Sequence, residues 1–217
     1  MKIMSEVSEK LTKLGFEKGS VVEIILVTRN PDETLNAAPM GVVRIDSETL
    51  EIKPYKSSST YRNLQHYPQA GVNITSNPEL FLFTAFKEEN EAPIDLIKED
   101  LSLKDSDATL IVKIIGVGDY SEKRAIFTTQ VISAKVRDQT PKVFSRGKAT
   151  AIEAVIHATR IKEFLKMGFI YDAERLITRV YECKNIIESV SGSETPEIKT
   201  INRLMKMIEG WRDVSSR

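Results

Sequence analysis

Cysteine and histidine are scarce in this sequence of 217 residues. Cys183 is the single cysteine, and His66 and His157 are the two histidines. A single cysteine cannot form a disulfide within the chain or supply a zinc cage built from thiolates. The two histidines are too isolated to form a metal-binding motif. We therefore predict no metal site.

An excess of charge of either sign is also absent. Lysine and arginine together number 31, and so do aspartate and glutamate. This balance gives no electrostatic argument for binding nucleic acid or an anionic membrane. No apolar run approaches the roughly 18 residues of a transmembrane helix, and residues 1–6 lack the apolar core of a signal peptide. We expect a cytoplasmic protein.

Several familiar catalytic motifs are missing as well. The sequence has no nucleophile elbow, no P-loop, no Gly-x-Gly-x-x-Gly fingerprint and no evident pair of catalytic carboxylates. Their absence fits a protein whose chemistry is carried by a bound cofactor.

The first two thirds of the chain have the pattern of short β-strands. Two runs rich in β-branched residues, 19–29 and 35–45, flank a Pro-Asp turn and predict a hairpin. Short helices are expected near residues 1–15, 60–67 and 78–86. Six strands with short helical interruptions predict a small antiparallel barrel over residues 1–144. The six predicted strands are 19–29, 35–45, 49–53, 70–75, 108–117 and 125–136.

The hydrophobic period then changes from two residues to about 3.6. Three helices are predicted at 148–167, 172–190 and 196–214, with Gly168 and Gly192 between them. We expect these helices to form a helical bundle or cap over residues 145–217. The predicted fold class is therefore mainly β with a helical C-terminal region.

The second strand of the hairpin is unusual between Asn36 and Gly41. This stretch carries small side chains, and Pro39 cannot donate a ladder hydrogen bond. The bare backbone would let a flat ligand approach closely. A poor edge strand that avoids aggregation explains the same residues equally well, and the strand alone leaves both interpretations open.

Four stretches resemble flavin-reductase-like split β-barrels that bind FMN, and in particular a family of uncharacterised archaeal flavoproteins. The match spans about residues 18–165, and the last fifty residues match only as helices. The turn at 31–34, Pro-Asp-Glu-Thr, departs from the Asp-Gly turn expected in the family. The stretches that carry the resemblance are 28–41, 59–64, 72–75 and 152–160.

The resemblance implies a homodimer that holds FMN at the subunit interface. One function is an oxidoreductase that passes hydride or electrons from a reduced nicotinamide or deazaflavin donor to an unknown acceptor. A second is a flavin-binding carrier or sensor without turnover of its own. A third, with slight support from the atypical turn, is an interaction module that has lost the ligand.

The resemblance also indicates which residues bind FMN. The hydroxyls of residues 57–60 lie where a short helix begins, and helix N-termini favour phosphate. Arg62, Arg29, Lys56 and Arg44 are candidate cations. Asn73 either binds the ligand or ties two loops together. The predicted FMN-binding residues are Arg29, Asn36, Ala37, Ala38, Pro39, Met40, Gly41, Ser58, Ser59, Thr60, Arg62, Asn63 and Asn73.

The predicted helix at 148–167 carries Glu153, His157 and Arg160 in one polar stripe between two apolar faces. The stripe is either a solvated seam or a polar group facing the flavin, with His157 as a candidate proton donor and catalytic residue. We expect His66 to be a surface or packing residue and Cys183 to be an inert buried thiol.

Overall fold

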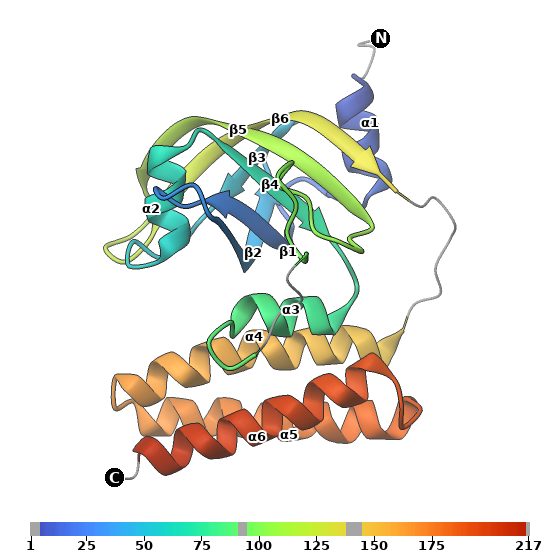
Figure 1. Cartoon of the computed structure of the whole chain (residues 1–217), viewed down its shortest axis with the longest axis vertical. Coiled ribbons are helices and arrows are strands. Elements are labelled where there is room, and N and C mark those ends of the chain that lie inside the picture. The colour runs from blue at the N-terminus through green and yellow to red at the C-terminus, as the bar shows by residue number, and fades with distance from the viewer. Residues whose placement is uncertain (1–4, 91–94, 138–144, 216–217) are drawn as a thin grey trace. The chain divides into compact units, whose positions relative to one another are not determined.

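The computed structural model describes residues 5–90, 95–137 and 145–215, with side chains up to Asp213. Contacts divide the chain into two compact units (Figure 1). The first, which we call the barrel unit, comprises Met1–Thr75 and Pro93–Thr140. The second, the helical unit, comprises Ser76–Ala92 and Pro141–Arg217.

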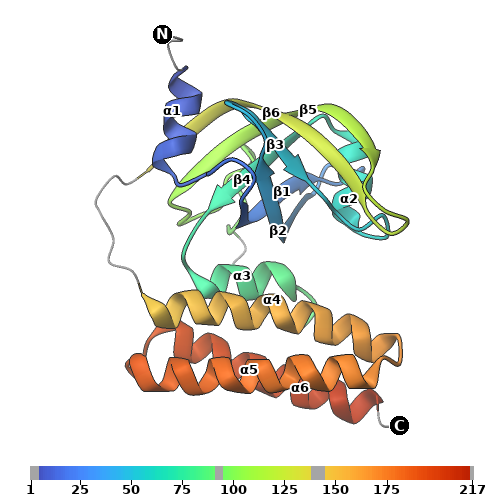
Figure 2. The same ribbon diagram turned by 180° about the vertical axis from the view of Figure 1, so that it is seen from behind.

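The barrel unit is a closed antiparallel barrel with the strand order β1-β2-β3-β6-β5-β4, and β1 closes it by pairing with β4 (Figures 1 and 2). The predicted six-stranded antiparallel barrel is therefore confirmed. Its strands are β1 (Val21–Arg29), β2 (Leu35–Arg44), β3 (Thr49–Ile52), β4 (Gln69–Ile74), β5 (Ala108–Asp119) and β6 (Ala125–Val136).

Alternate strand residues fill the inside of the barrel. Ile24 and Leu26 of β1 meet Leu50 of β3 and Phe127 of β6 in one cluster of buried side chains. Each such side chain stabilises the fold by about 1.5–3 kcal/mol through burial. The β-branched and aromatic pattern of the sequence therefore specifies the barrel interior.

Two short helices complete the barrel unit. These are α1 (Glu6–Lys13) and α2 (Ser59–His66). Arg44 donates hydrogen bonds to the Phe16 carbonyl oxygen at 3.0 Å and to Ser8 Oγ at 3.0 Å, and its side chain is buried. Arg44 thus fixes α1 to the end of β2, and its guanidinium is not available as the phosphate-binding cation suggested by the sequence.

The helical unit contains α3 (Pro78–Ala85), α4 (Arg146–Lys166), α5 (Ile170–Val190) and α6 (Pro196–Ser215). The three long helices confirm the predicted helical C-terminal region. Contacts group residues 76–92 with these helices, whereas the sequence division at residue 144 places them with the barrel. Within the described residues, no helix is both long enough and apolar enough to span a membrane.

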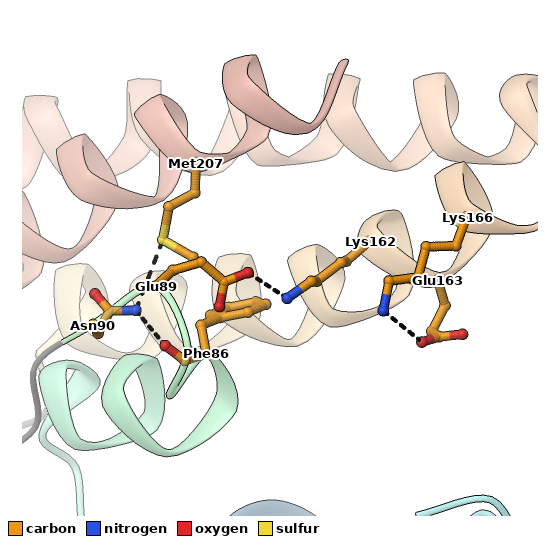
Figure 3. Close-up of polar contacts among 7 residues, drawn as sticks. All are labelled: Phe86, Glu89, Asn90, Lys162, Glu163, Lys166 and Met207. Carbon is orange, nitrogen blue, oxygen red and sulfur yellow. Dashed lines mark hydrogen bonds and ion pairs between the residues drawn. The ribbon is translucent and has the colours of Figure 1, made fainter. Parts of the chain in front are cut away.

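Aromatic and polar contacts anchor the end of α3 inside the helical unit (Figure 3). The ring centroids of Phe86 and Trp211 lie 5.3 Å apart, and Lys162 Nζ lies 5.7 Å from the Trp211 ring. Lys162 also pairs with Glu89, and Asn90 Nδ2 donates to the Phe86 carbonyl oxygen at 2.7 Å. These contacts explain why the segment after the fourth strand joins the C-terminal helices.

Candidate functional site

An open groove runs between α2 and the β1–β2 turn, which is the blue loop beside α2 in Figure 1. Its volume is about 320 Å³. The four α2 residues that line it are spaced i, i+3, i+4 and i+7, so they share one face of the helix. The lining residues are Ser59, Arg62, Asn63 and His66 from α2, and Asn30, Pro31 and Asp32 from the turn.

Ser58 is the N-cap of α2, one of the two serines, 58 and 59, that the sequence offers for this position. Its hydroxyl accepts from the Tyr61 backbone N–H at 3.2 Å and donates to the Tyr55 carbonyl oxygen at 2.7 Å. This capping leaves the next hydroxyl, that of Ser59, on the groove side, where Arg62 Nη2 donates to it at 3.0 Å. The Ser58 hydroxyl is therefore used to cap the helix, while the side chains of Ser59 and Arg62 are exposed in the groove.

Asn63 holds α2 against the hairpin. Its buried amide nitrogen donates to Thr28 Oγ1 at 2.9 Å and to Asn30 Oδ1 at 2.8 Å. Asn36 Nδ2 lies 3.5 Å from the same threonine oxygen. One network thus links α2 to both strands of the hairpin. Sequence reasoning did not single out Thr28 or Asn30, although both lie in the conspicuous stretch 28–41.

The unusual part of β2 has one unpaired edge. Residues 35–43 pair with β1, but pairing with β3 is confined to residues 42–44. Within the described part of the chain, residues 37–41 therefore pair with no strand on their second side. Ala37 is buried, whereas Asn36, Ala38, Pro39, Met40 and Gly41 are half-buried. This edge of the strand can meet a ligand or another strand.

Asn73 is fully buried, and its amide is satisfied within the protein. Its nitrogen donates to the Gly71 and Leu101 carbonyl oxygens at 3.2 and 3.0 Å. Its oxygen accepts from the Leu103 N–H and from Thr109 Oγ1, both at 2.8 Å. These four bonds favour the second of the two interpretations, in which Asn73 ties a loop to the barrel, over ligand binding.

Thr60 and Arg29 lie outside the groove lining. Thr60 is only 3% exposed and does not line the groove. Arg29 donates to the Glu33 carbonyl oxygen at 3.1 Å and pairs with Glu99 at 3.6 Å. It lines a second hollow of about 420 Å³, together with Tyr67, Pro68, Gln69, Glu99, Asp100, Leu101 and Ile111.

His157 is buried in the helical unit, whereas Glu153 and Arg160 of the same stripe are exposed. Its Nε2 lies 3.3 Å from Glu153 Oε1, and among the described residues Nδ1 has no hydrogen-bond partner. Burial lowers the pKa of His157, and the charges of Arg179 and Arg160 lower it further, while Glu153 opposes them. Proton donation by His157 to a flavin therefore stays an untested prediction.

Comparisons with known proteins identify related chains. A family model described as the N-terminal domain of a protein of unknown function (DUF447) matches residues 22–138. An FMN-bound protein of the same family from Methanosarcina mazei is 20% identical over 90% of this chain and 98% of that chain, with a TM-score of 0.71. At this identity, the similarity shows that the two proteins share a fold.

Two further solved structures overlap part of the chain. A flavin reductase domain protein from Arthrobacter is 21% identical, and the match covers 60% of this chain and 86% of that chain with a TM-score of 0.47. An FMN-binding protein from Thermus thermophilus is 12% identical, covering 58% and 77% of the two chains, also with a TM-score of 0.47.

Proposed function

This chain belongs to the DUF447 family, and on that premise we propose that it is a flavoprotein that binds FMN non-covalently on its barrel. One observation carries the proposal. The groove joins stretches 28–41 and 59–64, which lie apart in the sequence and both carry the flavin-reductase-like resemblance. The FMN-bound state of the Methanosarcina mazei protein supports the same assignment.

The groove residues suit the phosphate of FMN. Ser59 presents a hydroxyl and Arg62 a guanidinium, and both side chains are exposed in the groove. A guanidinium can donate two parallel hydrogen bonds to a phosphate, and the start of α2 adds a partial positive charge. Because Thr60 is buried, we assign the phosphate contacts to Ser59 and Arg62, and we treat Thr60 as a packing residue.

The free edge of β2 suits the flavin ring. Backbone groups of residues 37–41 can meet the polar rim of the isoalloxazine, because Ala38, Pro39 and Gly41 place little side-chain bulk beside them. Asn36 precedes this edge. Its side chain contacts Thr28, which in turn accepts a hydrogen bond from Asn63 in the lining of the groove. The proposed phosphate and ring sites are thus adjacent parts of the barrel unit.

Purification and reconstitution test FMN binding. We expect the protein to carry flavin absorbance when purified, or to bind added FMN with quenching of flavin fluorescence. A protein that neither retains FMN nor binds it at micromolar concentration would contradict the proposal.

Bound FMN would supply redox chemistry, and we propose an oxidoreductase as the function of the loaded protein. The donor would be a reduced nicotinamide or a reduced deazaflavin. The alternative is a carrier or sensor that holds FMN without turnover. Anaerobic mixing with each donor, followed by addition of a soluble acceptor, separates the two. Rapid bleaching and recovery of the flavin spectrum supports an enzyme, whereas slow bleaching with every donor supports the carrier.

We also propose that the protein is a homodimer, as the resemblance implies. Large apolar side chains at one end of the barrel support this proposal. Val117 is 65% exposed, Ile115 58% and Tyr120 57%. Burial of these side chains against a second copy would remove apolar surface from water. Sedimentation that gives a clean monomer near 24.5 kDa at micromolar concentration would contradict a dimer.

A further inference from the structure

His66 is the last of the four α2 residues that line the groove, and a hydrogen bond to the backbone of the same helix orients its ring. His66 Nδ1 lies 2.8 Å from the Arg62 carbonyl oxygen. A carbonyl oxygen only accepts hydrogen bonds, so Nδ1 carries the hydrogen in this contact. Nε2 is then the ring nitrogen that changes: it has a bare lone pair in the neutral ring and becomes an N–H donor in the charged ring.

His66 is an exposed residue that lines the groove, with one cation and one anion nearby. Arg62 lies one helical turn earlier on the same face, at the spacing that puts side chains next to each other. Asp32 faces them from the β1–β2 turn. Its carboxylate accepts from Thr34 Oγ1 at 2.6 Å and from the Thr34 N–H at 3.1 Å, and these bonds lower the pKa of Asp32.

A phosphate monoester in this groove would contact the side chains of Arg62 and His66, which lie on the same face of α2. The lone pair of a neutral Nε2 would repel the phosphate oxygens, whereas a protonated Nε2 would donate a charge-assisted hydrogen bond. A nearby anion favours the charged form of an imidazole. A dianionic phosphate beside Nε2 would therefore favour the protonated ring.

We propose that His66 recognises the phosphate of the bound flavin and takes up a proton from solvent at Nε2 when the phosphate binds. This inference rests on the proposed binding of FMN. It assigns His66, which the sequence suggests is a surface or packing residue, to the specificity for a phosphorylated flavin over riboflavin. It also predicts that the affinity for FMN falls as the pH rises, because the complex holds one proton more than its separate parts.

Isothermal titration calorimetry of the full chain at pH 7.5 tests the inference. Each titration is run in two buffers of different ionisation enthalpy, because proton uptake makes the observed heat depend on the buffer. At this pH the second phosphate pKa of about 6 has been passed, so free FMN is already dianionic. We expect FMN binding to take up a measurable fraction of one proton, and riboflavin binding to take up none.

Substitution assigns the proton to a residue. His66→Gln is expected to abolish the proton uptake and to weaken FMN binding by about tenfold, the loss typical of one charge-assisted hydrogen bond. Gln65→Ala is the matched control, because Gln65 is an exposed neighbour on α2 that does not line the groove. We expect the control to keep both the affinity and the uptake.

The possible outcomes distinguish the role of His66 from the binding of FMN itself. If the parent protein binds FMN with the same heat in both buffers, or if His66→Gln keeps the proton uptake, the role of His66 is wrong and FMN binding stands. If the parent protein binds no FMN, both proposals are overturned. The uptake by the parent protein is measured without any variant, so a variant that failed to fold would not obscure the result.

Discussion

Two buried asparagines of the barrel unit use their side-chain amides for hydrogen bonds within the protein. Asn63 and Asn73 are both almost fully buried, and each amide is used inside the protein. Asn63 positions α2 against the hairpin, so its effect on the groove is indirect. Asn73 secures the loop that contains Leu101 and Leu103. The exposed side chains of Ser59 and Arg62 are consequently the better candidates for direct contact with FMN.

Replacing Asn73 by alanine should destabilise the barrel without affecting the flavin site. The change leaves the Leu103 N–H and the Thr109 hydroxyl without their acceptor, and an unsatisfied buried group costs about 1–3 kcal/mol. We expect the free energy of unfolding in urea to fall by at least about 2 kcal/mol. A variant of parental stability that has lost FMN affinity would instead identify Asn73 as a ligand.

His157 should make the stability of the ligand-free protein depend on pH. Its pKa is lowered by burial from the ordinary value of 6.5, so near that pH the unfolded chain binds more protons than the folded one. The contribution is therefore complete above about pH 6.5 and is lost as the pH falls below it. We expect the free energy of unfolding to decrease from pH 7 to pH 5.5.

Substitution isolates this effect, because the chain has only one other histidine. His157→Gln should flatten the pH dependence between pH 7 and pH 5.5, and His66→Gln, at an exposed position, should leave it intact. Aspartate and glutamate titrate mainly below this range. An equal slope in the parent and in His157→Gln would show that the buried imidazole is not responsible.

At the scale of elements, one glycine allows α4 to begin close to the α5–α6 connection. A Cβ added at Gly147 would lie 2.2 Å from Ser191 Oγ and 3.3 Å from Glu197 Oε1. Ser191 Oγ also donates to the Glu197 carboxylate at 3.1 Å. The absent side chain at Gly147 therefore lets these groups pack against the first turn of the helix.

Two glycine-to-alanine changes test this packing. Gly147→Ala should lower the free energy of unfolding by about 1–3 kcal/mol, the usual cost of overpacking. Gly210→Ala, at a helical site with nothing within 4 Å of the added carbon, should raise it by about 0.5–1 kcal/mol. Equal effects of the two changes, measured by urea denaturation, would contradict a close approach at Gly147.

The elements could be predicted because their signals are local. Ser58 at the N-cap of α2 and Asn77-Pro78 at the start of α3 act within one helical turn, and both helices lie where they are predicted. The direction of a side chain depends on tertiary packing instead. The sequence therefore left the role of Asn73 open, and it could not show that Thr60 is buried while His66 lines the groove.

At the scale of the whole molecule, both stretches that form the groove belong to the barrel unit. The sequence predicted three of the seven residues that line it, Ser59, Arg62 and Asn63, because the resemblance marks the helix start. It did not predict that residues 76–92 join the C-terminal helices, since that grouping depends on contacts far apart in the chain, such as Phe86 with Trp211. The helical unit also holds His157, whose role in any redox reaction stays a prediction.

The most direct test of the account is a fluorescence titration of FMN and riboflavin with the parent protein, Arg62→Ala and Gln65→Ala. Arg62 is the only lysine or arginine among the described residues that line the groove. Loss of its charged hydrogen bonds, about 1.5–3 kcal/mol each, should weaken FMN binding at least about tenfold. Riboflavin affinity, and both affinities of Gln65→Ala, should be unchanged. If Arg62→Ala binds FMN as tightly as the parent, or loses FMN and riboflavin equally, the phosphate does not lie in this groove.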